Sequence, residues 1–153
     1  MLNDLLRIKR IREKSAEDEV RKCRYRVELA VQDVEKKKQE LVSYKEWRIQ
    51  EEKRLYDEIM NTAVKQFDLD IVKQTVALHR EKDLILQDAI TQAEEHLEET
   101  RKELEEAQQK HVLATQAVQK FEEFTDVINQ EEAKEKARIE ELELEEFTPR
   151  NRY

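Results

Sequence analysis

The chain has 153 residues, of which 43% are charged and 38% hydrophobic, and it contains one proline and no glycine. Without glycine it can form no glycine-rich phosphate-binding loop, and its apolar residues never form a run long enough to span a membrane. Because glycine and proline mark most turns, and because strong helix formers dominate the chain, we expect an almost entirely helical protein.

The net charge of −8 is unevenly distributed along the chain. Residues 1–26 carry nine Lys and Arg against five Asp and Glu, whereas residues 122–146 carry eleven acidic residues against three basic ones. Opposite charges attract when they lie close together, so this asymmetry weakly favours an antiparallel pairing of the two ends. The negative total charge and the scarcity of aromatic residues among the basic ones argue against binding to nucleic acid.

The first predicted helix covers about residues 3–61 and begins with a basic segment that contains too many apolar residues for one helix face. Some of these residues are expected to face outward or toward a partner. In the alternative, Leu5 and Ile8 close the structure on the apolar residues near position 124. The segment contains Leu2, Leu5, Leu6, Arg7, Ile8, Lys9, Arg10, Ile11 and Arg12, and the apolar residues near position 124 are Phe121, Phe124 and Ile128. The apolar start is too short for a signal peptide, so a cytoplasmic protein is expected.

An apolar stripe with alternating spacings of three and four follows, which is the pattern that keeps one helix face against a partner helix. Its positions are Ala16, Val20, Cys23, Val27, Ala30, Val34, Lys37, Leu41, Tyr44, Arg48, Glu51 and Leu55. Cys23 is the only cysteine, so no internal disulfide can form, and we expect it to be a small residue of this seam.

The seam turns polar at Arg48 and Glu51, and the large aromatic residues Trp47 and Tyr56 lie beside these positions. An exposed tryptophan or tyrosine close to arginine is typical of an interface hot spot. In the alternative interpretation, Trp47 covers weak polar layers of the seam. We favour the interface.

The spacing breaks between Leu55 and Leu69, so a reversal is predicted at about residues 62–68, with Asn61 ending the first helix and Asp68 capping the second. Thr62 or Asp70 could serve as the cap instead. The second helix is predicted over about residues 69–146. Its seam is Leu69, Val72, Val76, His79, Leu86, Ile90, Ala93, Leu97, Thr100, Leu104, Ala107, His111, Ala114, Val118, Phe121, Thr125 and Ile128, and it reappears at Ile139 and Leu142.

Folding the chain about position 65 places the apolar layers opposite each other, for example Val34 opposite Leu97 and Cys23 opposite Ala107. The predicted fold class is therefore all-α, a long antiparallel two-helix coiled-coil hairpin whose second helix is longer than the first. Residues 1–146 form one domain, residues 147–153 form a disordered tail, and the isolated chain is expected to be a monomer. Two heptad helices leave a parallel dimer as a competing structure.

A hairpin of two helices offers no enclosed pocket in which catalytic groups could converge, so we predict no enzyme activity, no catalytic residues and no cofactor. His79, His96 and His111 are not spaced to share a helix face, and a structural zinc site needs about four ligands. No metal site is predicted.

The segment around Trp47 also carries a family resemblance. Trp47-Arg48-Ile49, followed by Glu51-Glu52, Arg54-Leu55, Asp57 and Asn61-Thr62, resembles the YscO family of bacterial type III secretion proteins, which is similar in turn to the flagellar export protein FliJ. The resemblance extends to the basic start, to Leu78-His79-Arg80-Glu81-Lys82 and to Glu145-Glu146-Phe147.

The resemblance implies a non-catalytic central stalk that sits in the hexameric export ATPase and stimulates it, at the cytoplasmic face of the secretion apparatus. It also implies contacts with the export gate protein and with secretion chaperones for translocator proteins. On this basis the candidates for the ATPase contact are Leu5, Arg7, Ile8, Arg10, Arg12, Phe121 and Phe124. The candidates for the gate or chaperone contact are Trp47, Arg48, Leu55, Tyr56, Val76 and His79. The alternative is a generic coiled-coil scaffold or adaptor that forms a parallel dimer and does not touch an ATPase.

Overall fold

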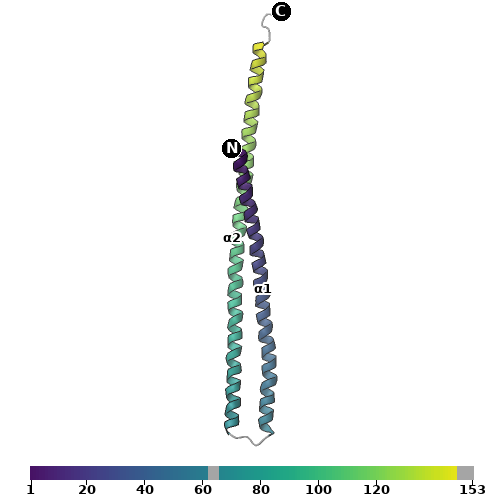
Figure 1. The fold of residues 1–153 in the computed structure, drawn as a ribbon, viewed down its shortest axis with the longest axis vertical. Coiled ribbons are helices and arrows are strands. Elements are labelled where there is room, and N and C mark those ends of the chain that lie inside the picture. Colours follow the sequence, from purple (N-terminus) through teal and green to yellow (C-terminus); the bar gives the residue numbers. More distant parts are fainter. Residues whose placement is uncertain (62–65, 148–153) are drawn as a thin grey trace, which may run out of the picture. The chain divides into compact units, whose positions relative to one another are not determined.

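The computed structural model describes residues 1–61 and 66–147, and these residues form two helices, α1 (Leu2–Met60) and α2 (Gln66–Phe147). No strand occurs within these two ranges, and α2 is the longer helix (Figure 1). The predicted all-α helical hairpin with a longer second helix is confirmed. Neither helix, over the residues described, has a stretch apolar enough to cross a membrane.

The helices pack in two compact units. The terminal unit joins Met1–Val20 to α2 from Ala107 onward, and the turn unit contains Arg21–Glu106. In the terminal unit, Arg10 Nη2 lies 3.0 Å from Glu122 Oε1. In the turn unit, Lys38 Nζ lies 3.9 Å from Glu94 Oε1. Both ion pairs join antiparallel helices in the register expected from folding the chain near position 65.

The seam is built mainly from small side chains. Thr100 and Thr125 are also buried, and their hydroxyls donate to the carbonyls of Leu97 and Phe121, each at 2.8 Å, so burial leaves neither hydroxyl unsatisfied. The buried apolar residues are Val20, Cys23, Ala30, Val34, Val72, Ala93, Ala107 and Val118. All eight lie at positions that the spacing predicts, and Cys23 is a seam residue as expected.

The start of α2 differs from the prediction. The helix begins at Gln66, so the predicted turn residues 66–68 are helical and Asp68 lies in the first turn instead of preceding it. A carboxylate is favourable in either place, because the first-turn amides and the helix dipole attract negative charge at both. Phe147, predicted as the first tail residue, is the last residue of α2. The other turn and tail predictions concern residues 62–65 and 148–153, which lie outside the described ranges.

The first turns of α1 extend the seam back to the start of the helix. Leu2, Leu6, Lys9 and Glu13 are partly buried there, whereas Leu5 and Ile8 are 47% and 42% exposed. The reason is the repeat itself, because spacings of three and four continued backward from Ala16 pass through these four positions and miss the other two. The alternative in which Leu5 and Ile8 close the hairpin is therefore wrong.

Beyond Ile128, α2 continues past the start of α1 (Figure 1). Every residue from 129 to 147 is exposed, because α1 has no residues left to cover them. We refer to residues 129–147 as the overhang.

The seam predicts how two valines on α1 differ. Val34 is 7% exposed, whereas Val31, one turn away on the same helix, is 44% exposed. We expect Val34→Ala to lower the free energy of unfolding by about 1–2 kcal/mol, because it removes buried methyl groups, and Val31→Ala to change it by less than about 0.5 kcal/mol. Urea unfolding followed by circular dichroism measures both, and equal losses would contradict this assignment of the seam.

Candidate functional site

A polar layer interrupts the seam of the turn unit. Arg48 of α1 donates from Nη1 to Oδ2 of Asp83 of α2, and the two side chains are only 21% and 10% exposed. Both residues occupy seam positions, so the helix packing forces them to face each other. Glu52, one turn further along α1, lies 3.8 Å from Arg48 Nε and 3.3 Å from His79 Nδ1. The layer thus links the ionisable groups of both helices.

Three aromatic rings cover this layer. The Trp47 ring centroid lies 5.2 Å from that of His79 and 5.7 Å from that of Tyr44. The Tyr44 hydroxyl donates to the His79 carbonyl oxygen at 3.3 Å, and Lys82 Nζ lies 4.9 Å from the centre of the Tyr44 ring. Burial, and then the charge of Asp83, raise the pKa of the Tyr44 phenol. Tyr44 is therefore held as a neutral donor.

We call Tyr44, Trp47, Arg48, Glu52, His79 and Asp83 the aromatic–ionic cluster. Trp47 packs on His79 and yet remains 50% exposed. One portion of the ring covers the polar layer, as the alternative interpretation expected, and the rest faces solvent. A half-exposed tryptophan held by its neighbours presents a pre-formed apolar surface next to charged groups, which is a favourable composition for an interface.

The polar layer is not fully hydrogen-bonded. Among the described residues, Arg48 Nε and Asp83 Oδ1 are buried atoms without a hydrogen-bond partner. The distance from Arg48 Nε to Glu52 Oε1 is short enough for attraction between charges but too long for a hydrogen bond. Such a layer contributes less stability than an apolar one, and it favours the single register in which the two charges meet.

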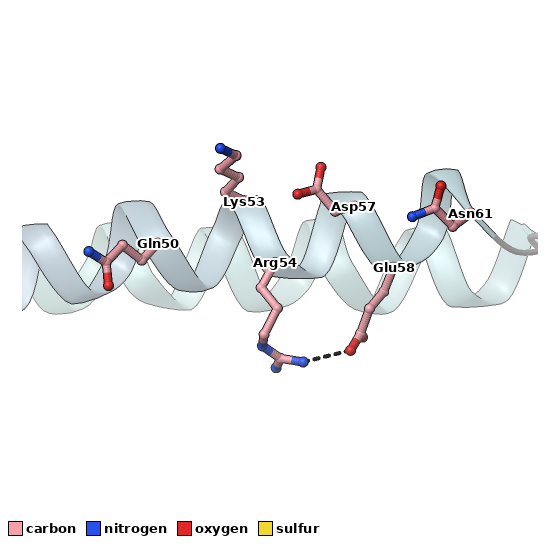
Figure 2. A pocket seen from close by; sticks show the side chains of 6 residues that line it. All are labelled: Gln50, Lys53, Arg54, Asp57, Glu58 and Asn61. Carbon is pink, nitrogen blue, oxygen red and sulfur yellow. Dashed lines mark hydrogen bonds and ion pairs between the residues drawn. The ribbon is translucent and has the colours of Figure 1, made fainter.

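The end of α1 carries a shallow groove (Figure 2). Arg54 holds Glu51 through two hydrogen bonds of 3.2 and 2.5 Å and donates to Glu58 at 2.7 Å. The hydrogen bonds from Arg54 lower the pKa of the Glu51 carboxyl. The groove is lined by five residues of α1 and by Asn61, which directly follows the helix, and all six are exposed; the five are Gln50, Lys53, Arg54, Asp57 and Glu58. It resembles a wet surface for contact with a partner more than a pocket for catalysis.

The structure divides the predicted gate or chaperone candidates into two kinds. Trp47, Arg48 and His79 lie together in the aromatic–ionic cluster. Leu55 and Val76 are partly buried seam residues, while Tyr56 is exposed.

The predicted ATPase candidates all lie in the terminal unit. Phe121 lies beneath Lys9, whose Nζ is 5.5 Å from its ring centre, and its own centroid is 6.1 Å from that of Phe124, which is exposed. Arg10 is engaged by Glu122. Arg7 and Arg12 have no ion-pair partner within residues 1–61 and 66–147. With the exposed Leu5 and Ile8, these two arginines give the start of α1 a basic, partly apolar surface.

Three residues of the aromatic–ionic cluster, Tyr44, Glu52 and Asp83, were not among the predicted site residues, although Tyr44 was predicted as a seam residue. Asp83 falls four positions after His79 and three before Leu86, so the spacing alone places it in the seam. Because an acidic residue is unusual there, the sequence interpretation passed over it. The pairing with Arg48 was accessible from the same folding position that matched the apolar layers.

No group of three or more histidine, cysteine or acidic side chains in the described part of the chain is arranged to hold a metal ion. Two long helices that pack along one seam define a coiled-coil protein.

Comparisons with known proteins give the family. The profile of the family described as type III secretion protein YscO matches residues 2–150, so the chain belongs to this family. A crystal structure of type III secretion protein YscO from Vibrio parahaemolyticus is similar to it, with a TM-score of 0.89 and 30% sequence identity. The similarity covers 97% of this chain and 93% of that one. The comparison with curated proteins gives no match.

The polar layer leads to a double-mutant prediction. Asp83→Leu alone leaves the Arg48 guanidinium without its partner, and we expect it to lower the free energy of unfolding by about 2–3 kcal/mol. Arg48→Leu combined with Asp83→Leu replaces the pair by an apolar layer, and we expect stability within about 1 kcal/mol of the unmodified chain. Urea unfolding of the two single variants and the double variant measures this coupling. Additive losses would mean that the two residues do not act as a pair.

Proposed function

We propose that this type III secretion protein is a non-catalytic central stalk that binds the hexameric export ATPase and stimulates it. One hairpin serves one ring and links it to the export gate protein and to the chaperones of translocator proteins, at the cytoplasmic face of the apparatus. Family membership supports the role in secretion. The observation that carries the ATPase proposal is the start of α1, where Leu5, Arg7, Ile8 and Arg12 are exposed and Phe124 adds an exposed ring from α2.

The proposed mechanism depends on asymmetry. Six equivalent subunits that close around a two-helix rod contact a different face of it at each interface, so the rod stabilises a different subunit conformation at each position. Binding changes an equilibrium only through such differential affinity. The rod can therefore couple successive ATP hydrolysis steps to one another, and through its other contacts to the gate.

The aromatic–ionic cluster is the proposed contact for the gate or a chaperone. Trp47 offers exposed apolar area next to charged groups, and its contacts with Tyr44 and His79 hold the ring in place before binding. A pre-organised ring loses little conformational entropy when a partner covers it. The exposed Tyr56 and the groove near Arg54 extend the same helix toward its end.

The ATPase proposal is tested by titrating the chain into its cognate export ATPase. We expect it to promote hexamer formation and to raise ATP turnover to a plateau, because a shared central ligand favours the closed ring. Turnover measured with a coupled assay, together with light scattering, follows both effects. Turnover that stays constant across a wide titration would contradict the stalk.

Charge reversal locates the contact. Arg7→Glu with Arg12→Glu should raise the concentration needed for half-maximal stimulation about tenfold, since both guanidiniums are exposed and without ion-pair partners in the described ranges. Arg101→Glu with Lys102→Glu, on the exposed surface of the turn unit, makes the same charge change as a matched control. Equal effects of the two pairs would mean that only total charge matters.

The second proposed contact is tested in cells. Trp47→Ala with Tyr56→Ala should reduce secretion while leaving the ATPase stimulation of the purified chain unchanged, because both rings lie in the turn unit. Tyr25→Ala, which removes another exposed aromatic ring of the same unit, is the control. Normal secretion by the double variant would exclude these two rings as a contact.

A further inference from the structure

The overhang presents a coiled-coil face that α1 does not cover. Counted from Thr125 and Ile128, the spacing of three and four continues through Glu132 and Glu135 to Ile139 and Leu142, so the face that packs on α1 elsewhere persists where α1 is absent. Ile139 and Leu142 are 46% and 51% exposed. The face of α2 that packs on α1 therefore continues into the overhang, where α1 does not cover it.

The same face is strongly acidic. Residues 129–147 carry eight acidic and three basic residues. A shallow groove there is lined by Ile139, Lys136 and four glutamates, Glu132, Glu135, Glu140 and Glu143. Arg138 neutralises Glu135 at 2.6 Å, whereas Glu132, Glu140 and Glu143 have no ion-pair partner within residues 1–61 and 66–147. An occupant of this face should therefore be a basic helix with a few exposed apolar residues.

The start of α1 has the complementary composition. Residues 1–14 carry five basic and two acidic residues. At about 100° per residue, Leu5 and Ile8 lie on the flank of α1 that faces away from the Arg10–Glu122 ion pair, and Phe124 lies on the corresponding flank of α2. These exposed apolar residues and Arg12, which has no ion-pair partner among the described residues, lie on one flank of the terminal unit. We call it the basic flank.

We infer that the occupant of the overhang is the basic flank of a second copy of this chain. The overhang starts at the level where α1 starts, so a two-fold axis at that level places each overhang along the first turns of the other copy's α1. The overhang is about 28 Å long and can cover roughly the first eighteen residues of α1. Both contacts form at once, which makes the interface isologous and closed.

Charge selects this arrangement over the other ways in which two copies could meet. Two overhangs placed side by side repel each other, and so do two basic flanks, whereas an overhang on a basic flank brings opposite charges and apolar residues together. The dimer also differs from a parallel coiled coil, because each chain keeps its own hairpin.

A consequence of the dimer rests on the proposed function. The basic flank contains four of the residues proposed to contact the ATPase, namely Leu5, Ile8, Arg12 and Phe124, so a flank covered by a second copy cannot enter the ring. Self-association would then hold free stalks in an inactive form, and the ATPase would compete with it.

Sedimentation equilibrium of the full chain alone tests the inference. We expect a monomer–dimer equilibrium whose Kd rises about tenfold or more between about 0.05 M and about 0.5 M salt, as the screening length falls from about 14 Å to about 4 Å. A chain that remains monomeric at all concentrations and at low salt overturns the inference. The ATPase proposal is unaffected by this outcome, because the measurement contains no ATPase.

A charge exchange tests the geometry. One variant carries Glu132→Lys, Glu140→Lys and Glu143→Lys in the overhang, and the other carries Arg12→Glu in the basic flank. The dimer Kd of each variant alone should rise at least tenfold. An equimolar mixture of the two variants should regain dimerisation, because both contacts of the mixed dimer again join opposite charges. Circular dichroism checks that each variant keeps its helices.

Glu28→Lys, Glu35→Lys and Glu105→Lys, on exposed positions of the turn unit, provide the matched control and should leave the dimer unchanged. Dimerisation that is insensitive to both sets of reversals, or a mixture that fails to regain it, overturns the inference. The first of these results would assign association to another surface, such as a parallel coiled coil.

Discussion

The close approach of two helices along a single seam is the constraint on which the rest of the structure depends. Ala30, Ala93 and Ala107 have side chains small enough to let the helices pack closely, and Cys23 and the buried threonines serve the same purpose. A hairpin of two helices has no second layer, so every residue outside the seam faces water or a partner. Most side chains of the described helices are therefore presented to solvent or to a partner, and the contacts proposed for this protein lie on these surfaces.

Within this constraint, the polar layer contributes less stability than an apolar layer would, but it specifies the register of the two helices. An apolar seam tolerates a shift by one heptad, whereas the Arg48–Asp83 pair forms in only one register. Two buried atoms of the pair lack hydrogen bonds, and the rings of Tyr44 and Trp47 shield the layer from water. The exposed tryptophan and the register of the hairpin are thus fixed by the same set of contacts. In the terminal unit, the overhang is exposed because α1 has no residues left to cover it.

Much of this structure follows from the spacing of apolar residues. A chain without glycine and rich in strong helix formers is expected to be helical, and the spacing then decides which face of each helix is buried. The buried residues from Val20 to Val118 occupy predicted positions. The start of α2 could not be fixed, since Thr62, Asp68 and Asp70 are all competent caps and the sequence does not rank them. Asp83 was missed because an acidic residue is unusual in a seam, even though the spacing of three and four places it there. The outward position of Leu5 was accessible from the repeat, whereas the Arg10–Glu122 ion pair depends on side-chain conformations that no spacing determines.

The position of Trp47 has one further consequence. It is the only tryptophan in the chain, and its ring lies against His79 in the polar layer of the seam. The intrinsic fluorescence of the protein therefore originates at the place where the hairpin register is set, and the neighbouring imidazole can quench it. Emission from the unlabelled chain reports directly on whether this layer is closed, opened or covered by a partner, without any added dye.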